Sequence, residues 1–170
     1  FRKNIQIVFQ DPYASLNPLH NIYQIISEPL IFHKICGKED LYDECKKLIN
    51  DVGLSEKYLD SYPHELSGGQ RQRVCIARAI SVKPQVLICD ESVSALDVSI
   101  QATVLNLLNQ LKKKYSFTYI FISHDLSVIR HMSDKILVLH NGKIVEYNDA
   151  DLLFKKPKDS YTKKLINASL

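Results

Sequence analysis

Glycine is scarce in this sequence, and none of its glycines begins a phosphate-binding loop. A P-loop requires the pattern Gly-x-x-x-x-Gly-Lys-Ser/Thr, in which a second glycine follows the first by five positions. The sequence has five glycines in 170 residues. Counting five positions on from each glycine gives, in turn, Tyr42, Tyr58, Arg73, Val74 and Tyr147. The 170 residues therefore contain no P-loop.

Long apolar runs are also absent. The longest, such as Tyr119–Ile122 and Ile136–Leu139, fall far short of the roughly twenty residues that a membrane-spanning helix needs. We therefore expect any association with a membrane to come through partner proteins.

Neither the cysteines nor the charges favour a metal site or a nucleic-acid ligand. No Cys-x-x-Cys spacing occurs among Cys36, Cys45, Cys75 and Cys89, which favours reduced thiols over a metal site. The formal net charge is only +3, and the lysines are scattered rather than gathered in one basic surface. We expect no nucleic-acid partner.

Segments typical of strands and helices alternate along the chain. The 45% hydrophobic and 24% charged content is that of an ordinary globular protein, and the length suits one domain. Apolar spacing and turn residues predict strands over Ile5–Phe9, Val86–Cys89, Thr118–Ile122, Lys135–His140 and Lys143–Tyr147, the last two joined by Asn141-Gly142. They predict helices over Leu19–His33, Glu39–Val52, Ser67–Ile80, Ser99–Lys114 and Leu126–Met132, and a helical tail over Asp149–Leu170. This alternation predicts an α/β fold with a mostly parallel sheet.

The segment Leu66-Ser67-Gly68-Gly69-Gln70 has the sequence of a helix start that can face an anion. Ser67 and Gln70 have the Ser-x-x-Gln spacing of a capping box, in which each side chain accepts a hydrogen bond from the other residue's backbone. A capping box alone needs neither glycine. Two glycines let the backbone approach an anion closely, while the first N–H groups of the helix point at it.

Two carboxylates follow the apolar strand Val86–Cys89, at Asp90 and Glu91. Ligands of open α/β sheets bind at the carboxyl ends of the strands, and the two carboxylates lie at such an end. Such a position suits a magnesium ion and a water molecule. The alternative is a solvated strand end with no chemical role.

These two motifs, in this order, resemble the nucleotide-binding subunit of an ABC transporter from end to end of the chain. The sequences of Val8–Pro18 and Ser94–Ala102 are similar to those of the branch that serves oligopeptide and dipeptide importers, and within it to the F-type subunit. Nickel importers share that branch. The resemblance implies a P-loop NTPase-like ABC ATPase domain, incomplete at its N-terminus, with its P-loop upstream of Phe1. It implies a partial nucleotide-binding domain over residues 1–148, with a helical insert over 19–66, and a C-terminal helical extension over 149–170.

The resemblance also implies roles for individual residues, and a first group of them would act on the ATP molecule and its metal ion within the same subunit. Glu91 would accept a proton from the attacking water, Asp90 would hold Mg²⁺, and Gln10 would reach the metal or the water and couple the site to the membrane subunit. His124, in Ser123-His124-Asp125, would touch the γ-phosphate. A lone histidine or glutamine after a strand is otherwise structural.

A second group of residues would act across the contact between two subunits. Ser67, Gly68, Gly69 and Gln70 would contact the γ-phosphate of an ATP molecule held by the partner subunit. Asp97 would lie at the dimer interface and communicate between the two sites; its alternative role is that of a turn residue near a helix N-terminus.

The function implied is ATP hydrolysis that drives peptide import at the cytoplasmic face of the membrane, with ATP and Mg²⁺ as cofactors. The partners implied are a sister ATP-binding subunit, transmembrane permease subunits and, indirectly, a substrate-binding protein. The alternatives are a nickel importer, a soluble ABC-fold ATPase that acts on nucleic acid, and a non-catalytic module that only completes a partner's site. Without the P-loop lysine, we expect these 170 residues alone neither to bind ATP tightly nor to hydrolyse it.

Overall fold

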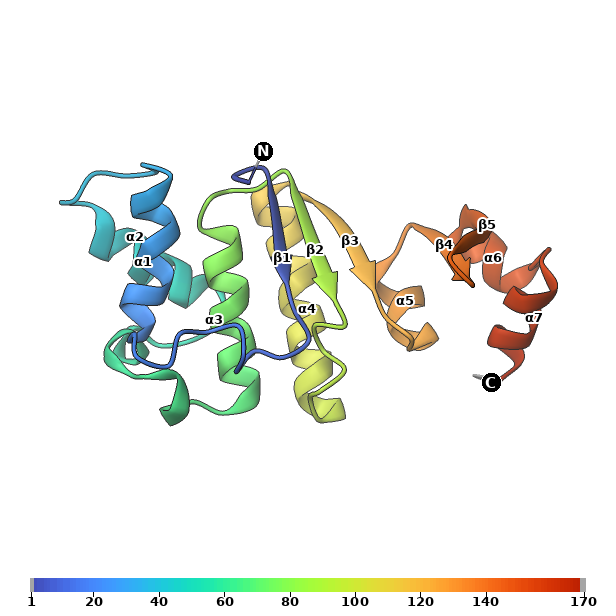
Figure 1. Cartoon of the computed structure of the whole chain (residues 1–170), viewed down its shortest axis with the longest axis horizontal. Helices are drawn as coiled ribbons and strands as arrows, with labels where there is room; N and C mark the ends of the chain where they lie inside the picture. Colours follow the sequence, from blue (N-terminus) through green and yellow to red (C-terminus); the bar gives the residue numbers. More distant parts are fainter. Residues whose placement is uncertain (1, 169–170) are drawn as a thin grey trace. The chain divides into compact units, whose positions relative to one another are not determined.

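The structure is a computed structural model, and it describes residues 2–168 (Figure 1). Its strands are β1 (Ile5–Val8), β2 (Val86–Asp90), β3 (Thr118–Ile122), β4 (Lys135–His140) and β5 (Lys143–Asp149). Its α-helices are α1 (Ile22–Phe32), α2 (Leu41–Asp51), α3 (Gly68–Ile80), α4 (Val98–Tyr115), α5 (Leu126–Met132), α6 (Ala150–Lys155) and α7 (Ser160–Asn167). Two short 3₁₀-helices, η1 (Glu56–Asp60) and η2 (Pro63–Glu65), precede α3. Among the helices of residues 2–168, none is both long and apolar enough to cross a membrane.

The chain forms two compact units, which divide between Ile120 and Phe121, within β3. The predicted domain boundary between residues 148 and 149 stays a prediction. The two units are described separately below.

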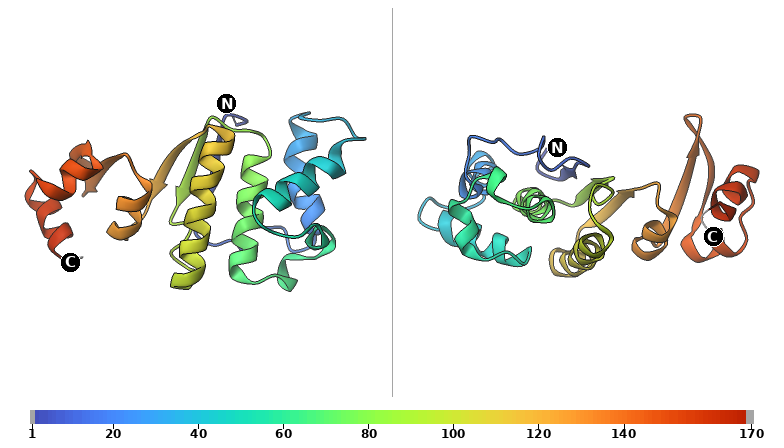
Figure 2. Two further views of the ribbon diagram at one scale, coloured as in Figure 1. Left: turned by 180° about the vertical axis from the view of Figure 1, so that it is seen from behind. Right: turned by 90° about the horizontal axis from the view of Figure 1, so that it is seen from below.

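The first unit is built on a sheet with the strand order β1-β2-β3. β1 and β2 pair in parallel, from Ile5 opposite Val86 to Val8 opposite Cys89. Because the pair is parallel, Gln10 after β1 and Asp90 at the end of β2 leave the sheet at the same edge. α3 and α4 run alongside this sheet, and α1 and α2 lie beyond α3 (Figures 1 and 2).

The first helix of the helical insert begins later than the sequence predicts. The side chain of Asn21 accepts a hydrogen bond from the backbone of Gln24, and the Gln24 side chain accepts one from the backbone of Asn21, both at 2.9 Å. This capping box starts α1 at Ile22, so the predicted start at Leu19 is wrong, and Leu19 is 82% exposed in the preceding loop. The insert buries Ile26 and other apolar side chains of α1 and α2 completely.

The second unit is a β-hairpin covered by helices. β4 and β5 pair antiparallel, and Asn141 and Gly142 between them both have positive φ, at 49° and 73°, as a tight hairpin turn requires. One face of the hairpin packs in a buried cluster that also includes residues of α5, α6 and α7: Ile129, Ile136, Val138, Ala150, Leu153 and Ile166.

The predicted helical tail is two helices rather than one. α6 ends at Lys155, and α7 begins at Ser160, because Pro157 lacks the N–H that a continuous helix would need. The buried carboxylate of Glu146 accepts hydrogen bonds from the backbone N–H groups of Lys158 and Asp159, both at 3.0 Å, which fixes this link to β5. The last two residues of the predicted tail, Ser169 and Leu170, lie outside the described residues.

Candidate active site

A hydrogen-bonded turn follows the two carboxylates at the end of β2. Glu91 has a φ of 45°, in the left-handed region that residues other than glycine rarely adopt. The backbone carbonyl of Glu91 accepts two hydrogen bonds from Ser94, one from its N–H at 3.1 Å and one from its hydroxyl at 2.9 Å. Backbone strain of this kind persists where the surroundings hold it, and it is common at active sites.

Gln10 is joined to this turn. Its side-chain Nε2 donates to the Ser94 hydroxyl at 3.2 Å, and the same hydroxyl donates to the carbonyl of Glu91. Two segments 84 positions apart in the sequence therefore meet at one edge of the sheet. The structure thus links Gln10, through Ser94, to the backbone of Glu91, which the sequence predicts to be catalytic.

The carboxylate and amide oxygens at this edge suit a magnesium ion that is bound mainly by a nucleotide. Mg²⁺ in nucleotide sites is held by one or two protein carboxylates, by phosphate oxygens and by water. Asp90 and Gln10 provide that limited set of oxygen donors. In residues 2–168, no three or more His, Cys, Asp or Glu side chains gather as a group that could hold a metal ion by themselves. The neighbouring Cys89 is completely buried, and burial raises the pKa of its thiol to about 12.

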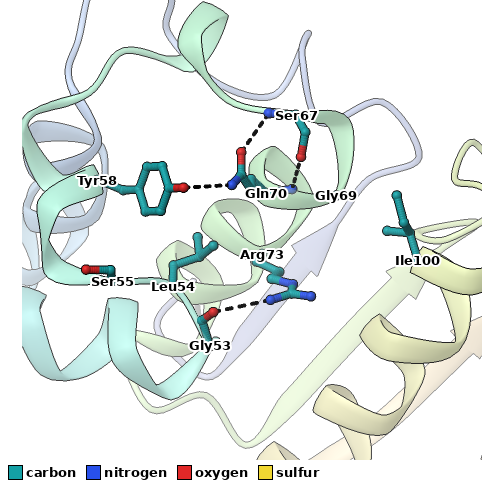
Figure 3. A pocket seen from close by; sticks show the side chains of 9 residues that line it. All are labelled: Gly53, Leu54, Ser55, Tyr58, Ser67, Gly69, Gln70, Arg73 and Ile100. Atoms are coloured by element: carbon teal, nitrogen blue, oxygen red, sulfur yellow. Dashed lines mark hydrogen bonds between the residues drawn. The ribbon is translucent and has the colours of Figure 1, made fainter.

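The segment from Ser67 to Gln70 forms the capping box that the sequence predicts. The Ser67 hydroxyl accepts from the Gln70 backbone N–H at 3.3 Å, and the Gln70 side-chain oxygen accepts from the Ser67 backbone N–H at 2.8 Å. The Gln70 side-chain nitrogen also donates to the hydroxyl of Tyr58 in η1, at 3.1 Å (Figure 3). The amide of Gln70 is therefore held from two sides.

A cavity of about 270 Å³ opens beside this helix start. Its lining comes from the segment before η1, from η1, from α3 and from α4: Gly53, Leu54, Ser55, Tyr58, Ser67, Gly69, Gln70, Arg73 and Ile100 (Figure 3). The N-terminus of α3 and the guanidinium of Arg73 both place positive charge at the cavity. Its lining therefore suits an anionic group.

The two glycines of this segment differ in their surroundings. A Cβ atom added to Gly69 would lie 2.5 Å from Cγ2 of Ile100 in α4, which is too close for any side chain. A Cβ atom added to Gly68 would lie 3.8 Å from its nearest neighbour, Cδ2 of Leu96, an ordinary contact. Close packing of α3 on α4 requires glycine at position 69 only.

Asp97 occupies the cap position of α4, but its side chain makes no capping hydrogen bond within the described part of the chain. Asp97 is exposed, and the neighbouring Val98 is 82% exposed. Both residues are thus available at the surface of the first unit. Helix capping does not account for an aspartate here.

His124 lies in the second unit, exposed, in the segment between β3 and α5. The next residue, Asp125, caps α5 by accepting hydrogen bonds from the backbone N–H groups of Ser127 at 2.8 Å and Val128 at 3.4 Å. The cap fixes the backbone on one side of His124.

The family model described as "ABC transporter" matches residues 1–94 of the chain. The chain belongs to the ABC transporter family. It is 48% identical over 169 residues to the oligopeptide transport ATP-binding protein OppF of Bacillus subtilis (strain 168), covering 99% of this chain and 55% of that protein. It is 46% identical over 168 residues to the dipeptide transport ATP-binding protein DppF of Escherichia coli (strain K12), covering 99% of this chain and 50% of that protein. The chain thus spans about half the length of the curated relatives it matches.

Solved structures of ABC proteins share the fold. CbiO1 from Clostridium perfringens, part of the ABC transporter complex cbiONQ, matches with a TM-score of 0.82 and 28% identity over 91% of this chain and 61% of that chain. The ATP-binding cassette MJ0796, in a dimeric post-hydrolysis state bound to ADP and Pi, matches with a TM-score of 0.74 and 29% identity over 86% of this chain and 63% of that chain. The predicted α/β fold of an ABC ATPase domain is confirmed.

Several residues that organise the site in this ABC protein were missed by sequence reasoning. In the sequence, Ser94 and Ile100 stand out only as parts of the longer motif Ser94–Ala102, and Tyr58 does not stand out as a site residue. Each acts through a contact with a residue 12 or more positions away. No local pattern in the sequence could have indicated these partners.

Proposed function

We propose that the protein is the ATP-hydrolysing subunit of an ABC importer that takes up oligopeptides or dipeptides. The observation that supports this most directly is the edge where β1 and β2 end. There the predicted catalytic and metal-binding residues Glu91, Asp90 and Gln10 come from two parallel strands, and Ser94 joins Gln10 to the carbonyl of Glu91. The similarity to oligopeptide and dipeptide transport ATP-binding proteins supports the substrate class.

Glu91 is the proton acceptor in this proposal. The oxygen of a water molecule attacks the γ-phosphorus of ATP, the bond from that phosphorus to the bridging oxygen breaks, and ADP leaves. Glu91 takes the proton that the water loses. Asp90 and Gln10 would hold Mg²⁺, which when bound neutralises charge on the phosphates. His124 would contact the γ-phosphate from the segment after β3.

The segment from Ser67 to Gln70 would contact the γ-phosphate of an ATP molecule bound by a sister subunit. Ser67, Gly69 and Gln70 line the cavity at the N-terminus of α3, where helix N–H groups stabilise an anion. The exposed Asp97 would lie in the contact between the two subunits. The P-loop of this subunit would come from sequence outside the 170 residues.

The remaining partners follow from an importer function. Transmembrane permease subunits would dock on the protein at the cytoplasmic face of the membrane, and a substrate-binding protein would act on the other side. We propose no nucleic-acid partner. The transported molecule would contact the permease and the binding protein rather than this subunit. Nickel is the runner-up substrate, because nickel importers share the same branch of the family.

The decisive experiment compares the wild type with Glu91→Gln in the full-length protein, paired with its sister subunit. We expect Glu91→Gln to bind ATP but to lose hydrolysis, because Gln cannot accept the proton. Glu28→Gln is the matched control, since Glu28 is an exposed glutamate on α1. Hydrolysis that survives in Glu91→Gln would refute the role of Glu91, and no hydrolysis in the wild type would favour a module that only completes its partner's site. Uptake of labelled peptide against labelled nickel by the whole transporter distinguishes the two substrates.

A further inference from the structure

One face of α3 holds the loop that follows β1. The thiol of Cys75 donates to the carbonyl of Pro12 at 3.7 Å, and the guanidinium of Arg78 donates to the carbonyl of Ser15 at 2.6 Å. Within the loop, the carboxylate of Asp11 accepts hydrogen bonds from the backbone N–H groups of Tyr13 and Ala14, which makes the loop a compact turn. The loop from Asp11 to Ser15 is therefore attached to α3 along its length.

Arg71 makes the third attachment on the same face, four positions before Cys75. Its guanidinium carbon lies 5.5 Å from the ring centroid of Tyr13, in a cation–π contact. The same guanidinium donates to the backbone carbonyls of Leu66 at 2.6 Å and Pro63 at 3.2 Å. Leu66 immediately precedes Ser67, the first residue of the predicted phosphate-binding segment, and Pro63 lies in η2 just before it.

The loop that Arg71 holds begins at Gln10, whose side chain contacts Ser94 and, through it, the carbonyl of Glu91. A continuous series of contacts thus runs from the backbone before Ser67 to the backbone of Glu91. Arg71 is the point in this series where a single side chain contacts both the loop and the backbone just before the phosphate-binding segment.

We propose that Arg71 is a positioning residue that, through the Tyr13 ring, sets the place of Gln10 at the catalytic edge relative to the phosphate-binding start of α3. This inference rests on the proposed function, because it assigns Arg71 to the ATPase reaction. Arg71 touches neither nucleotide nor metal in this scheme. It acts by fixing the loop, because a displacement of the reacting groups by about 1 Å or less lowers turnover.

The first test measures ATP hydrolysis against ATP concentration in the full-length protein paired with its sister subunit. Tyr13→Leu removes the ring, and a cation–π contact at an exposed site corresponds to about a 2- to 5-fold loss of kcat. We expect KM for ATP to stay unchanged, because the loop acts on the reaction edge. Tyr13→Phe keeps the ring and should retain the kcat of the wild type. Tyr42→Leu is the matched control, since Tyr42 is similarly exposed, at 50% against 55% for Tyr13.

A double variant tests whether Arg71 and Tyr13 act through their mutual contact or independently of each other. Arg71→Gln removes the cation and should lower kcat more than Tyr13→Leu does, because it also frees the carbonyls before Ser67. If the two residues act through their mutual contact, adding Tyr13→Leu to Arg71→Gln should cause no further loss of kcat. Losses in kcat that multiply would show that Arg71 and Tyr13 act separately, and would overturn the proposal.

The second test does not depend on hydrolysis. Cys75 and Cys89 are both buried, at 2% and 0% exposed, so both thiols react slowly with an alkylating reagent in the folded protein. Because the loop covers Cys75, Tyr13→Leu and Arg71→Gln should raise its alkylation rate by about 2- to 5-fold, as measured by mass spectrometry, and leave Cys89 in β2 unchanged.

The outcomes of the two tests are distinct. Equal acceleration at Cys75 and Cys89 would indicate general destabilisation and overturn the proposal, as would no acceleration at Cys75. If the wild type hydrolyses no ATP, the proposed function fails on its own, while the alkylation rates still decide whether Arg71 and Tyr13 hold the loop.

Discussion

Substituting the two glycines at the start of α3 by alanine should have opposite effects on stability. Neither Gly68 nor Gly69 has a positive φ, so alanine is compatible with the backbone at both positions. At Gly69 the new Cβ would lie 2.5 Å from Cγ2 of Ile100. That methyl group is attached directly to the β-carbon of a branched residue in a helix, where χ1 is nearly fixed, so it has no freedom to swing away.

The size of the effect follows from overpacking on one side and chain entropy on the other. Inserting a methyl group into a closely packed contact costs about 1–3 kcal/mol, so Gly69→Ala should lower the free energy of unfolding by that amount. At Gly68 the nearest atom to the new Cβ is Cδ2 of Leu96, at 3.8 Å. Gly68→Ala should therefore raise the free energy of unfolding by about 0.4–1 kcal/mol, because alanine restricts the unfolded chain more than glycine does.

Urea unfolding of the full-length protein measures both variants against the wild type. A second substitution identifies the cause: Ile100→Ala removes the obstructing methyl group and should recover most of the loss in Gly69→Ala. Both glycines are proposed to contact the phosphate, so hydrolysis could fall in both variants while stability separates them. Equal destabilisation at the two positions, or no recovery with Ile100→Ala, would refute the packing argument.

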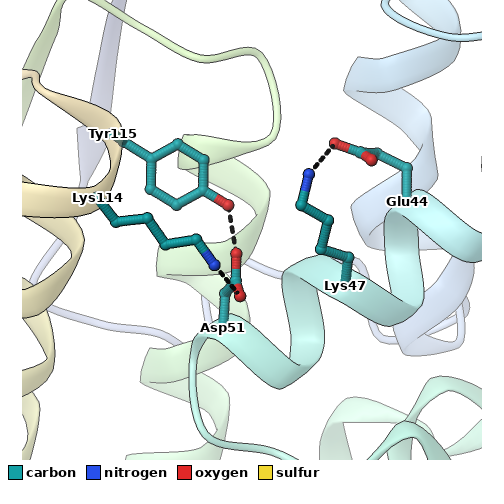
Figure 4. A network of polar contacts seen from close by, with 5 residues as sticks. All are labelled: Glu44, Lys47, Asp51, Lys114 and Tyr115. Atoms are coloured by element: carbon teal, nitrogen blue, oxygen red, sulfur yellow. Dashed lines mark hydrogen bonds and ion pairs between the residues drawn. The ribbon is translucent and has the colours of Figure 1, made fainter.

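Two further predictions concern carboxylates, one partly buried and one buried. Asp51 of α2 accepts hydrogen bonds from the Tyr115 hydroxyl and, at 2.5 Å, from the Lys114 side chain of α4 (Figure 4); Asp51→Asn should lower the free energy of unfolding by about 1–2 kcal/mol, measured by urea unfolding. Burial and the Asp51 carboxylate raise the pKa of Tyr115, so ultraviolet titration should show that this pKa falls in Asp51→Asn. Burial alone would raise the pKa of Glu146, but the backbone N–H groups of Asp159 and Lys158 lower it below 4.5. Its contribution is therefore complete above pH 4.5 and lost as the pH falls through the lowered pKa, so Glu146→Gln should destabilise the protein at neutral pH and weaken its loss of stability in acid.

Features whose signal is local could be predicted from the sequence. The capping box of Ser67 and Gln70 and the Asn141-Gly142 turn each involve residues within three positions of each other, and the structure confirms both. The apolar run before Asp90 likewise predicts a strand without reference to the rest of the chain. For Asp90 and Glu91 the sequence left two interpretations, a solvated strand end and a site. The parallel pairing of β1 with β2 brings Gln10 to the same edge of the sheet, which the sequence alone does not show.

Contacts between distant segments could not be predicted in this way. The cation–π contact of Arg71 with Tyr13 joins residues of a loop and a helix that share no periodic pattern. The two glycines look equivalent in the sequence, and only the position of Ile100 on α4 distinguishes them. Side chains that meet across elements depend on how those elements pack, which a single sequence does not reveal.

Gln70 illustrates how such a distant contact changes the chemistry of a residue that the sequence had identified. A glutamine amide has an oxygen with two acceptor positions and a nitrogen with two N–H donors. The oxygen of Gln70 already accepts from the Ser67 N–H at 2.8 Å, and one donor goes to Tyr58 at 3.1 Å. A phosphate oxygen accepts hydrogen bonds and does not donate them, so only the second N–H of Gln70 is left for it. Tyr58, which belongs to η1 rather than to α3, therefore fixes the direction in which that N–H points.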